Sequence, residues 1–133
     1  MLSAFVFALG VIASNAVACW DNSDRIILQL KKLNLNTEQL KDVFLYQKEH
    51  KDVVARAHKE GLGCRYHENH DAVFEKKAVG VLTGAQFKKH TGRGRTKVES
   101  LKYDNRLLKK EIAKLKEMIK KLQAELAKLK SAK

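Results

Sequence analysis

The 133-residue chain is strongly basic, with 27 lysines and arginines against 15 aspartates and glutamates, which gives a net charge of +12. Its length allows one small domain with an appendage and excludes two domains with separate cores. The lack of proline favours helices, and the positive charge predicts acidic partners such as nucleic acid, an anionic membrane or negatively charged proteins.

The first 18 residues have the pattern of a secretory signal peptide. Residues 4–13 are an apolar run that is too short to span a bilayer comfortably, and the A-x-A pattern of a cleavage site follows at residues 16–18. No lysine or arginine precedes the apolar run, so an uncleaved anchor is the alternative. We therefore expect an exported protein, periplasmic or otherwise, for which cytoplasmic DNA is out of reach and ATP is not available.

Cleavage after residue 18 would leave Cys19 as the first residue of the mature chain. Lipidation of Cys19 would then anchor a lipoprotein, although residues 16–19 match the lipidation pattern poorly. Cys64 is the only other cysteine, and an oxidising compartment favours a disulfide between Cys19 and Cys64, within or between chains. A lipidated Cys19 could not form that disulfide, so both alternatives stay open.

Four short helices and one long helix are expected, and no segment has the pattern of a strand. Apolar spacing predicts helices at about 25–33, 37–58 and 72–81, a loop at 64–70, and a helix that begins at Thr83 and ends at the glycines of a basic hinge, residues 93–97. In the second helix, Gln47, His50 and Lys51 interrupt the apolar stripe and predict a middle that is more solvated than the ends. The expected fold is all-α, a helical hairpin or cradle-like domain over residues 19–92 followed by a long C-terminal coiled-coil helix.

Two short motifs stand at the expected starts of the second and fourth helices. Their residues are Leu35, Gln39, Leu82, Thr83 and Gln86. Thr83 can accept a backbone N–H of the first turn while Gln86 reaches back to the cap, which is the capping-box arrangement. Over residues 30–92 the chain resembles the Spy/CpxP family of periplasmic stress proteins, whose LTxxQ motif appears twice. Asn36 departs from that motif, because it replaces the first threonine.

Residues 98–130 have the heptad pattern of a parallel dimeric coiled coil. The a and d positions, an apolar stripe interrupted only by Asn105, are occupied by Val98, Leu101, Asn105, Leu108, Ile112, Leu115, Ile119, Leu122, Leu126 and Leu129. β-Branched residues at a with leucine at d favour two parallel strands, and a single Asn105 at a fixes the register. An antiparallel pair would set e positions against e positions, and four of the five are lysines that would repel one another: Lys102, Lys109, Lys116 and Lys130. The alternative is that this helix folds back on its own domain.

Three other features point to weaker hypotheses. Cys64, His67 and His70 follow one another at intervals of three residues and could bind a divalent transition metal. The alternative is that they lie in a solvated loop in which Cys64 forms a disulfide. The basic residues before the heptads resemble the basic region of DNA-binding zippers, but glycines interrupt them, so we expect no nucleic-acid partner. No catalytic constellation stands out, and we expect no enzyme.

The family resemblance implies an ATP-independent chaperone or envelope-stress protein that binds unfolded or acidic clients. The second helix supplies the expected client surface, with Phe44, Tyr46, Lys48, Lys51, Val54 and Arg56. One alternative is a coiled-coil adaptor or spacer in the cell envelope, where a lysine-rich rod suits an anionic surface. The other is a periplasmic metal-binding sensor.

Overall fold

The computed structural model describes residues 21–133. The predicted signal peptide at 1–18 and the predictions for Cys19 lie outside the described residues. Within residues 21–133 the chain forms five helices and no strand, so the all-α prediction is confirmed. The helices are α1 (Ser23–Lys31), α2 (Thr37–Lys59), α3 (Cys64–Val79), α4 (Gly84–Thr91) and α5 (Lys97–Ser131).

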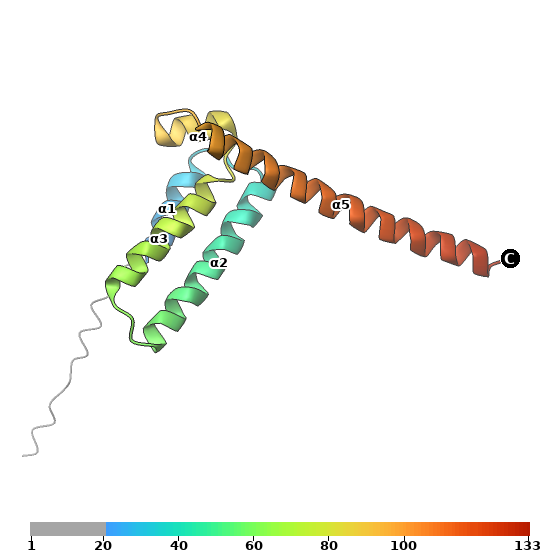
Figure 1. The fold of residues 1–133 in the computed structure, drawn as a ribbon, viewed down its shortest axis with the longest axis horizontal. Coiled ribbons are helices and arrows are strands. Elements are labelled where there is room, and N and C mark those ends of the chain that lie inside the picture. The colour runs from blue at the N-terminus through green and yellow to red at the C-terminus, as the bar shows by residue number, and fades with distance from the viewer. Residues whose placement is uncertain (1–20) are drawn as a thin grey trace, which may run out of the picture.

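Helices α2 and α3 form a hairpin, and α1 packs against both of its arms (Figure 1). The hairpin turns at Gly61, whose backbone has a positive φ of 71°, a conformation that glycine adopts without strain. The core lies between α1, the hairpin and the start of α4. It consists of Ile26, Ile27, Leu30, Val43, Phe74, Ala78, Val81, Leu82 and Phe87.

The predicted loop at residues 64–70 is wrong, because these residues are the first two turns of α3. The buried positions of α3 are His67, Asp71, Phe74 and Ala78, which recur at helical spacing. Two of the four are polar, and a search for apolar spacing therefore starts the helix too late. The helix begins after Gly63, whose extended backbone forms the N-cap.

The expectation of a solvated middle in α2 is wrong for Gln47 and His50, although Lys51 is exposed. Gln47 and His50 are 9% and 4% exposed, and they lie on the same buried face as Val43, Val54 and Ala57. Because buried polar groups require partners, the helical domain has to satisfy a set of polar contacts in its interior.

The segment between α4 and α5 is tied down by its own side chains. Gly92 ends α4 in the left-handed conformation, with φ 75°. Thr96 then caps α5 in a third capping box, where its side chain accepts the N–H of Glu99 and the Glu99 side chain accepts the N–H of Thr96. Arg93 donates two hydrogen bonds of 2.8 Å to the Glu99 carboxylate. The predicted basic hinge at 93–97 is therefore a short, bonded link.

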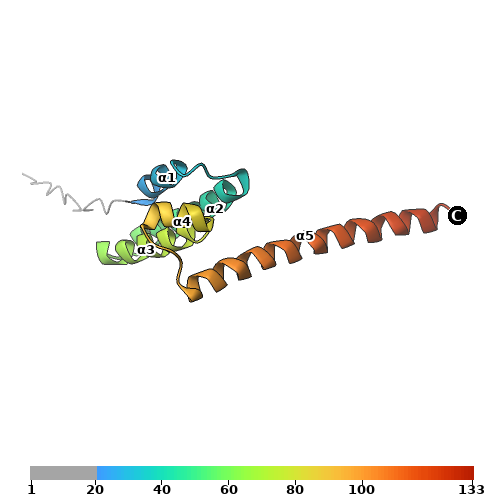
Figure 2. The same ribbon diagram turned by 90° about the horizontal axis from the view of Figure 1, so that it is seen from above.

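Helix α5 is the longest element, and most of it projects away from the rest of the chain. Its 35 residues span about 52 Å at 1.5 Å per residue. Side chains of its first turns contact the helical domain, while the remainder extends as a single rod (Figures 1 and 2). In the residues that the structure describes, no helix combines the length and the apolarity that crossing a membrane requires.

Candidate functional site

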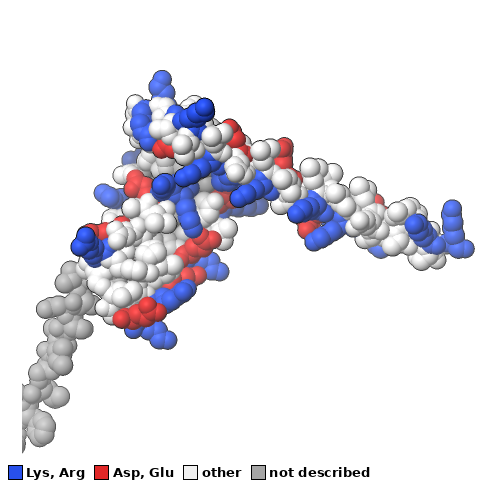
Figure 3. All heavy atoms as spheres, in the orientation of Figure 1, with Lys and Arg blue, Asp and Glu red and all other residues white. Residues whose placement is uncertain are grey.

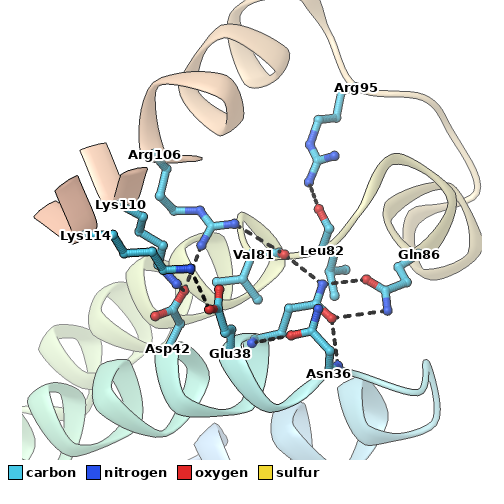
Figure 4. A network of polar contacts seen from close by, with 11 residues as sticks. Asn36, Glu38, Asp42, Val81, Leu82, Gln86, Arg95, Arg106, Lys110 and Lys114 are labelled. Carbon is cyan, nitrogen blue, oxygen red and sulfur yellow. Dashed lines mark hydrogen bonds and ion pairs between the residues drawn. The ribbon is translucent and has the colours of Figure 1, made fainter. Parts of the chain in front are cut away.

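The two sequence motifs meet in space and form one hydrogen-bond network (Figure 4). Asn36 caps α2 and Thr83 caps α4, each in a complete capping box with a glutamine at the third helical position. The two glutamines contact each other, because Gln39 Nε2 donates to Gln86 Oε1 at 2.7 Å. The sequence predicts each box separately, but nothing local indicates that they touch.

Both glutamines also bind the backbone of other segments. Gln39 Nε2 donates to the carbonyl of Val81 at 2.9 Å, and Gln86 Nε2 donates to the carbonyl of Leu33 at 3.1 Å. The leucines of the motifs support the core, since Leu82 is fully buried and Leu35 packs against the core from its edge. The motif residues therefore lock the start of α2 to the start of α4.

Cationic side chains attach α5 to this locked region. Arg106 donates to Asp42 Oδ2 at 2.7 Å, and Lys110 binds the same oxygen. Lys114 pairs with Glu38 at 2.9 Å, and this hydrogen bond lowers the pKa of the Glu38 carboxyl. In the heptad, Arg106, Lys110 and Lys114 occupy positions b, f and c, which face away from a and d. The docked face of α5 is thus opposite to its apolar stripe.

The apolar stripe of α5 has no partner among the described residues. Its nine hydrophobic side chains range from 51% exposed at Ile112 to 67% exposed at Leu129, and no residue of α5 is buried. A stripe of this length on a monomeric surface is typical of an interaction site. The described helix does not fold back on its own domain through that stripe, which was the alternative to a coiled coil.

A groove of about 490 Å³ opens between the hairpin, α4 and the first turns of α5. We call it the basic aromatic groove. It is lined by Tyr46, Ala72, Glu75, Lys76, Lys77, Val79, Gly80, Phe87, His90, Thr91, Arg93, Arg95, Glu99, Lys102, Tyr103 and Arg106. Six of these residues are lysine or arginine and two are glutamate, so the lining carries a net positive charge.

Arg95 and three aromatic rings organise the groove. The Arg95 guanidinium lies 4.6 Å from the centre of the Phe87 ring and 4.3 Å from the centre of the Tyr103 ring, and it donates to the carbonyl of Leu82. Lys77 lies 5.5 Å from the Tyr46 ring. Cations over ring faces are favourable at these distances. Burial lowers the pKa of Arg95, but a guanidinium stays charged at neutral pH.

Lysine and arginine side chains also gather on the surface where α5 leaves the helical domain (Figure 3). The basic aromatic groove therefore opens in a region of positive potential. A ligand that combines apolar and acidic groups would be attracted by the charge and could then contact the rings.

The six residues predicted for client binding do not form one surface. Phe44, Lys48, Lys51 and Arg56 are exposed, but Val54 is 9% exposed and belongs to the packing between helices. Tyr46 lines the basic aromatic groove, about 200° around α2 from Phe44 at 100° per residue. Sequence spacing alone did not separate the groove side of α2 from its outer side.

The residues predicted as metal ligands do not converge. Cys64 is disulfide-bonded, so it offers no thiolate, and Cys19, the only other cysteine of the sequence, lies outside the described residues. His67 is buried with its ring centre 4.5 Å from that of His58, while His70 packs against Tyr66. The proposed set of Cys64, His67 and His70 is therefore not supported by this geometry.

Comparisons with models of protein families, with curated proteins and with solved structures found no match. The resemblance to the Spy/CpxP family stays a prediction that rests on the two motifs.

Proposed function

We propose that this chain is an exported, ATP-independent chaperone-like protein that holds unfolded, acidic client segments in the basic aromatic groove. The proposal is carried by the lining of that groove, in which three aromatic rings lie among six basic side chains. Charge complementarity speeds the encounter with an acidic client. Tyr46, Phe87 and Tyr103 then offer apolar contact to side chains that a folded client would bury. The resemblance to periplasmic stress proteins supports the same function.

Suppression of client aggregation tests the proposal. An acidic protein is unfolded in denaturant and diluted into buffer without ATP, with and without the purified chain, and light scattering is followed. We expect less scattering with the chain present. Raising the salt concentration from about 0.05 to 0.5 M should slow capture, because the Debye length falls roughly threefold and electrostatic steering is screened. No suppression at any salt concentration would refute the proposal.

Charge reversals on three surfaces locate the capture site. Lys76→Glu with Lys77→Glu changes the groove wall on α3, whereas Lys121→Glu with Lys128→Glu makes the same change in charge on exposed c positions of α5. We expect the groove pair to weaken capture and the distal pair to leave it nearly unchanged. Equal losses would indicate general attraction by charge and no defined site.

The third pair tests the outer face of α2 that the sequence predicted as the client surface. Lys48 and Lys51 are exposed there, and Lys51 makes a surface ion pair of 3.3 Å with Asp24. If Lys48→Glu with Lys51→Glu weakens capture more than the groove pair does, clients bind the outer face and the groove assignment is wrong.

A second candidate function is a coiled-coil adaptor or spacer in the cell envelope, and the exposed apolar stripe of α5 favours it. We propose that two copies pair in parallel through this stripe, with Asn105 facing Asn105. Asn105→Val should then raise the thermal stability of the oligomer and loosen its specificity for two strands, because the buried amide pair selects register at a cost in stability. Thermal unfolding measures the stability of both proteins, and sedimentation measures the number of strands. A monomer in both cases would refute the pairing.

A further inference from the structure

Three separate segments bring Asp21, His50 and Asp71 together inside the helical domain. His50 Nε2 lies 2.9 Å from Asp71 Oδ1 and 3.2 Å from Asp21 Oδ1, and one atom of each residue falls within 4.8 Å of the others. Asp21 precedes α1, His50 is in the second half of α2 and Asp71 is in the middle of α3. None of these residues belongs to the basic aromatic groove.

The hydrogen bonds within this cluster leave one carboxylate oxygen without a donor. The Nε2 atom of an imidazole carries at most one hydrogen, and here it is hydrogen-bonded to Asp21 Oδ1. Asp71 Oδ1 is close to the same nitrogen but receives no hydrogen bond, although it is shielded from solvent in a residue that is 9% exposed. A buried, unpaired carboxylate oxygen is costly. A cation between the three side chains would remove that cost.

The two carboxylates are held in place from outside the cluster. Asn22 Nδ2 donates to Asp71 Oδ2 at 3.0 Å, and the backbone N–H of Ser23 donates to Asp21 Oδ1 at 2.8 Å. Such outer hydrogen bonds orient ligands in metal sites.

We propose that Asp21, His50 and Asp71 bind a divalent transition metal of the zinc type, through one imidazole nitrogen and two carboxylate oxygens. Tetrahedral zinc with bonds of about 2.0–2.2 Å separates its ligand atoms by roughly 3.3–3.5 Å. The separations of His50 Nε2 from the two carboxylate oxygens, 2.9 and 3.2 Å, reach that range with shifts of a few tenths of an ångström. A nitrogen ligand and only three protein ligands disfavour calcium and magnesium.

The site has an access route and a structural consequence. The Asp21 side chain is 27% exposed, against 2% for His50, so a metal would enter on the side of Asp21 and keep a water or other ligand there. Because the three ligands come from three segments, the metal would join the start of α1 to both arms of the hairpin. Metal binding should therefore stabilise the helical domain as well as occupy the site.

Zinc titration of the metal-free full chain tests the site, with calorimetry and native mass spectrometry giving the stoichiometry. We expect one zinc per chain and a rise in melting temperature on the order of 10 °C at a hundredfold excess over the dissociation constant. Asp71→Asn keeps the shape of the side chain and removes its charge, and His50→Gln removes the nitrogen ligand. Each should weaken binding at least tenfold, the usual lower effect of losing a contact in a metal site.

Two matched variants separate this site from its alternatives. Asp24→Asn removes a neighbouring carboxylate that lies outside the cluster, and His67→Gln removes a member of the set that the sequence predicted. Both should leave zinc binding and the rise in melting temperature unchanged. Circular dichroism identifies any variant that fails to fold. If either His50→Gln or Asp71→Asn does not fold, zinc binding by the other variant is the test. The proposal would be overturned if the unmodified chain did not bind stoichiometric zinc. It would also be overturned if His67→Gln lost zinc binding while Asp71→Asn kept it.

Discussion

Gln39 should be the most important single residue of the two motifs, because it completes the capping box of α2 and also binds Gln86 in the capping box of α4. Its Oε1 accepts the N–H of Asn36 at 2.9 Å, and its Nε2 donates to Val81 O at 2.9 Å and to Gln86 Oε1 at 2.7 Å. Each such bond contributes about 1 kcal/mol net. We therefore expect Gln39→Ala to lower the free energy of unfolding by about 3 kcal/mol, since it leaves Val81 O with only a 3.4 Å contact from Arg106.

A double-mutant cycle measures the contact between the two boxes directly. Gln86→Ala should cost about 2 kcal/mol, because its bonds with Gln39 and Leu33 contribute about 1 kcal/mol each and the exposed bond from the Thr83 N–H contributes little. Gln39→Ala with Gln86→Ala should cost less than the sum by about 1 kcal/mol, the contribution of the bond that both single variants lose. Thr83→Ala is the control, with an expected loss of about 0.5–2 kcal/mol for the cap alone.

Urea unfolding followed by circular dichroism gives these energies from the shift in midpoint. All variants have to be compared at one protein concentration, because oligomerisation would add its own stability, and equal slopes are needed for the comparison. Additivity within about 0.3 kcal/mol would mean that the two boxes act independently, and the network in Figure 4 would not hold α2 to α4. A smaller effect of Gln39→Ala than of Thr83→Ala would refute the same reasoning.

Three further predictions concern α5. The full chain should sediment as a dimer at about tens of micromolar, and a chain ending at Ser100 as a monomer; a full-length monomer would contradict the pairing. Asp42→Ala should broaden the spin-label distance distribution between the helical domain and the end of α5, while the exposed Asp52→Ala leaves it narrow. Hydrogen bonds, chiefly from Arg93, hold the pKa of Glu99 at about 2 against an ordinary 4.5. The charged cap therefore stabilises α5 fully above pH 4.5 and is lost as the pH falls through about 2, which an NMR titration of Glu99 checks.

The parts of the fold that sequence predicted well depend on interactions between residues close in the chain. Capping joins positions three residues apart, and the starts of α2 and α4 follow from it. The third box, Thr96 with Glu99, has the same spacing. The glycines that precede it favour a flexible segment, and the sequence therefore predicts a hinge at 93–97 in place of a cap. Gly61 ends the first arm of the hairpin through its own backbone preference, which is also local.

The parts that sequence missed depend on polar groups that the tertiary structure buries. Hydrophobic spacing treats His50, His67 and Asp71 as exposed, although all three are at most 9% exposed. Asp71 shows why spacing misses them, because one of its carboxylate oxygens accepts a hydrogen bond from Asn22, 49 residues away. The contact of Gln39 with Gln86 spans 47 residues. No pattern within one helix encodes such pairs, so the proposed metal site could be found only from the folded chain.

Helix α5 has two opposite faces, one that contacts the helical domain and one that carries the exposed apolar stripe. Their positions limit how a dimer can be built. The heptad pattern predicts only the stripe at a and d. Arg106 and Lys110, which pair with Asp42, cannot be told from solvated charges by their sequence. Because the docked face is opposite to the stripe, a second helix could cover the stripe without displacing Asp42. A parallel pair would then carry its two helical domains on the outside of the rod and at the same end. An antiparallel pair would place them at opposite ends, so the distance between labels on the two domains distinguishes the arrangements without disturbing either face.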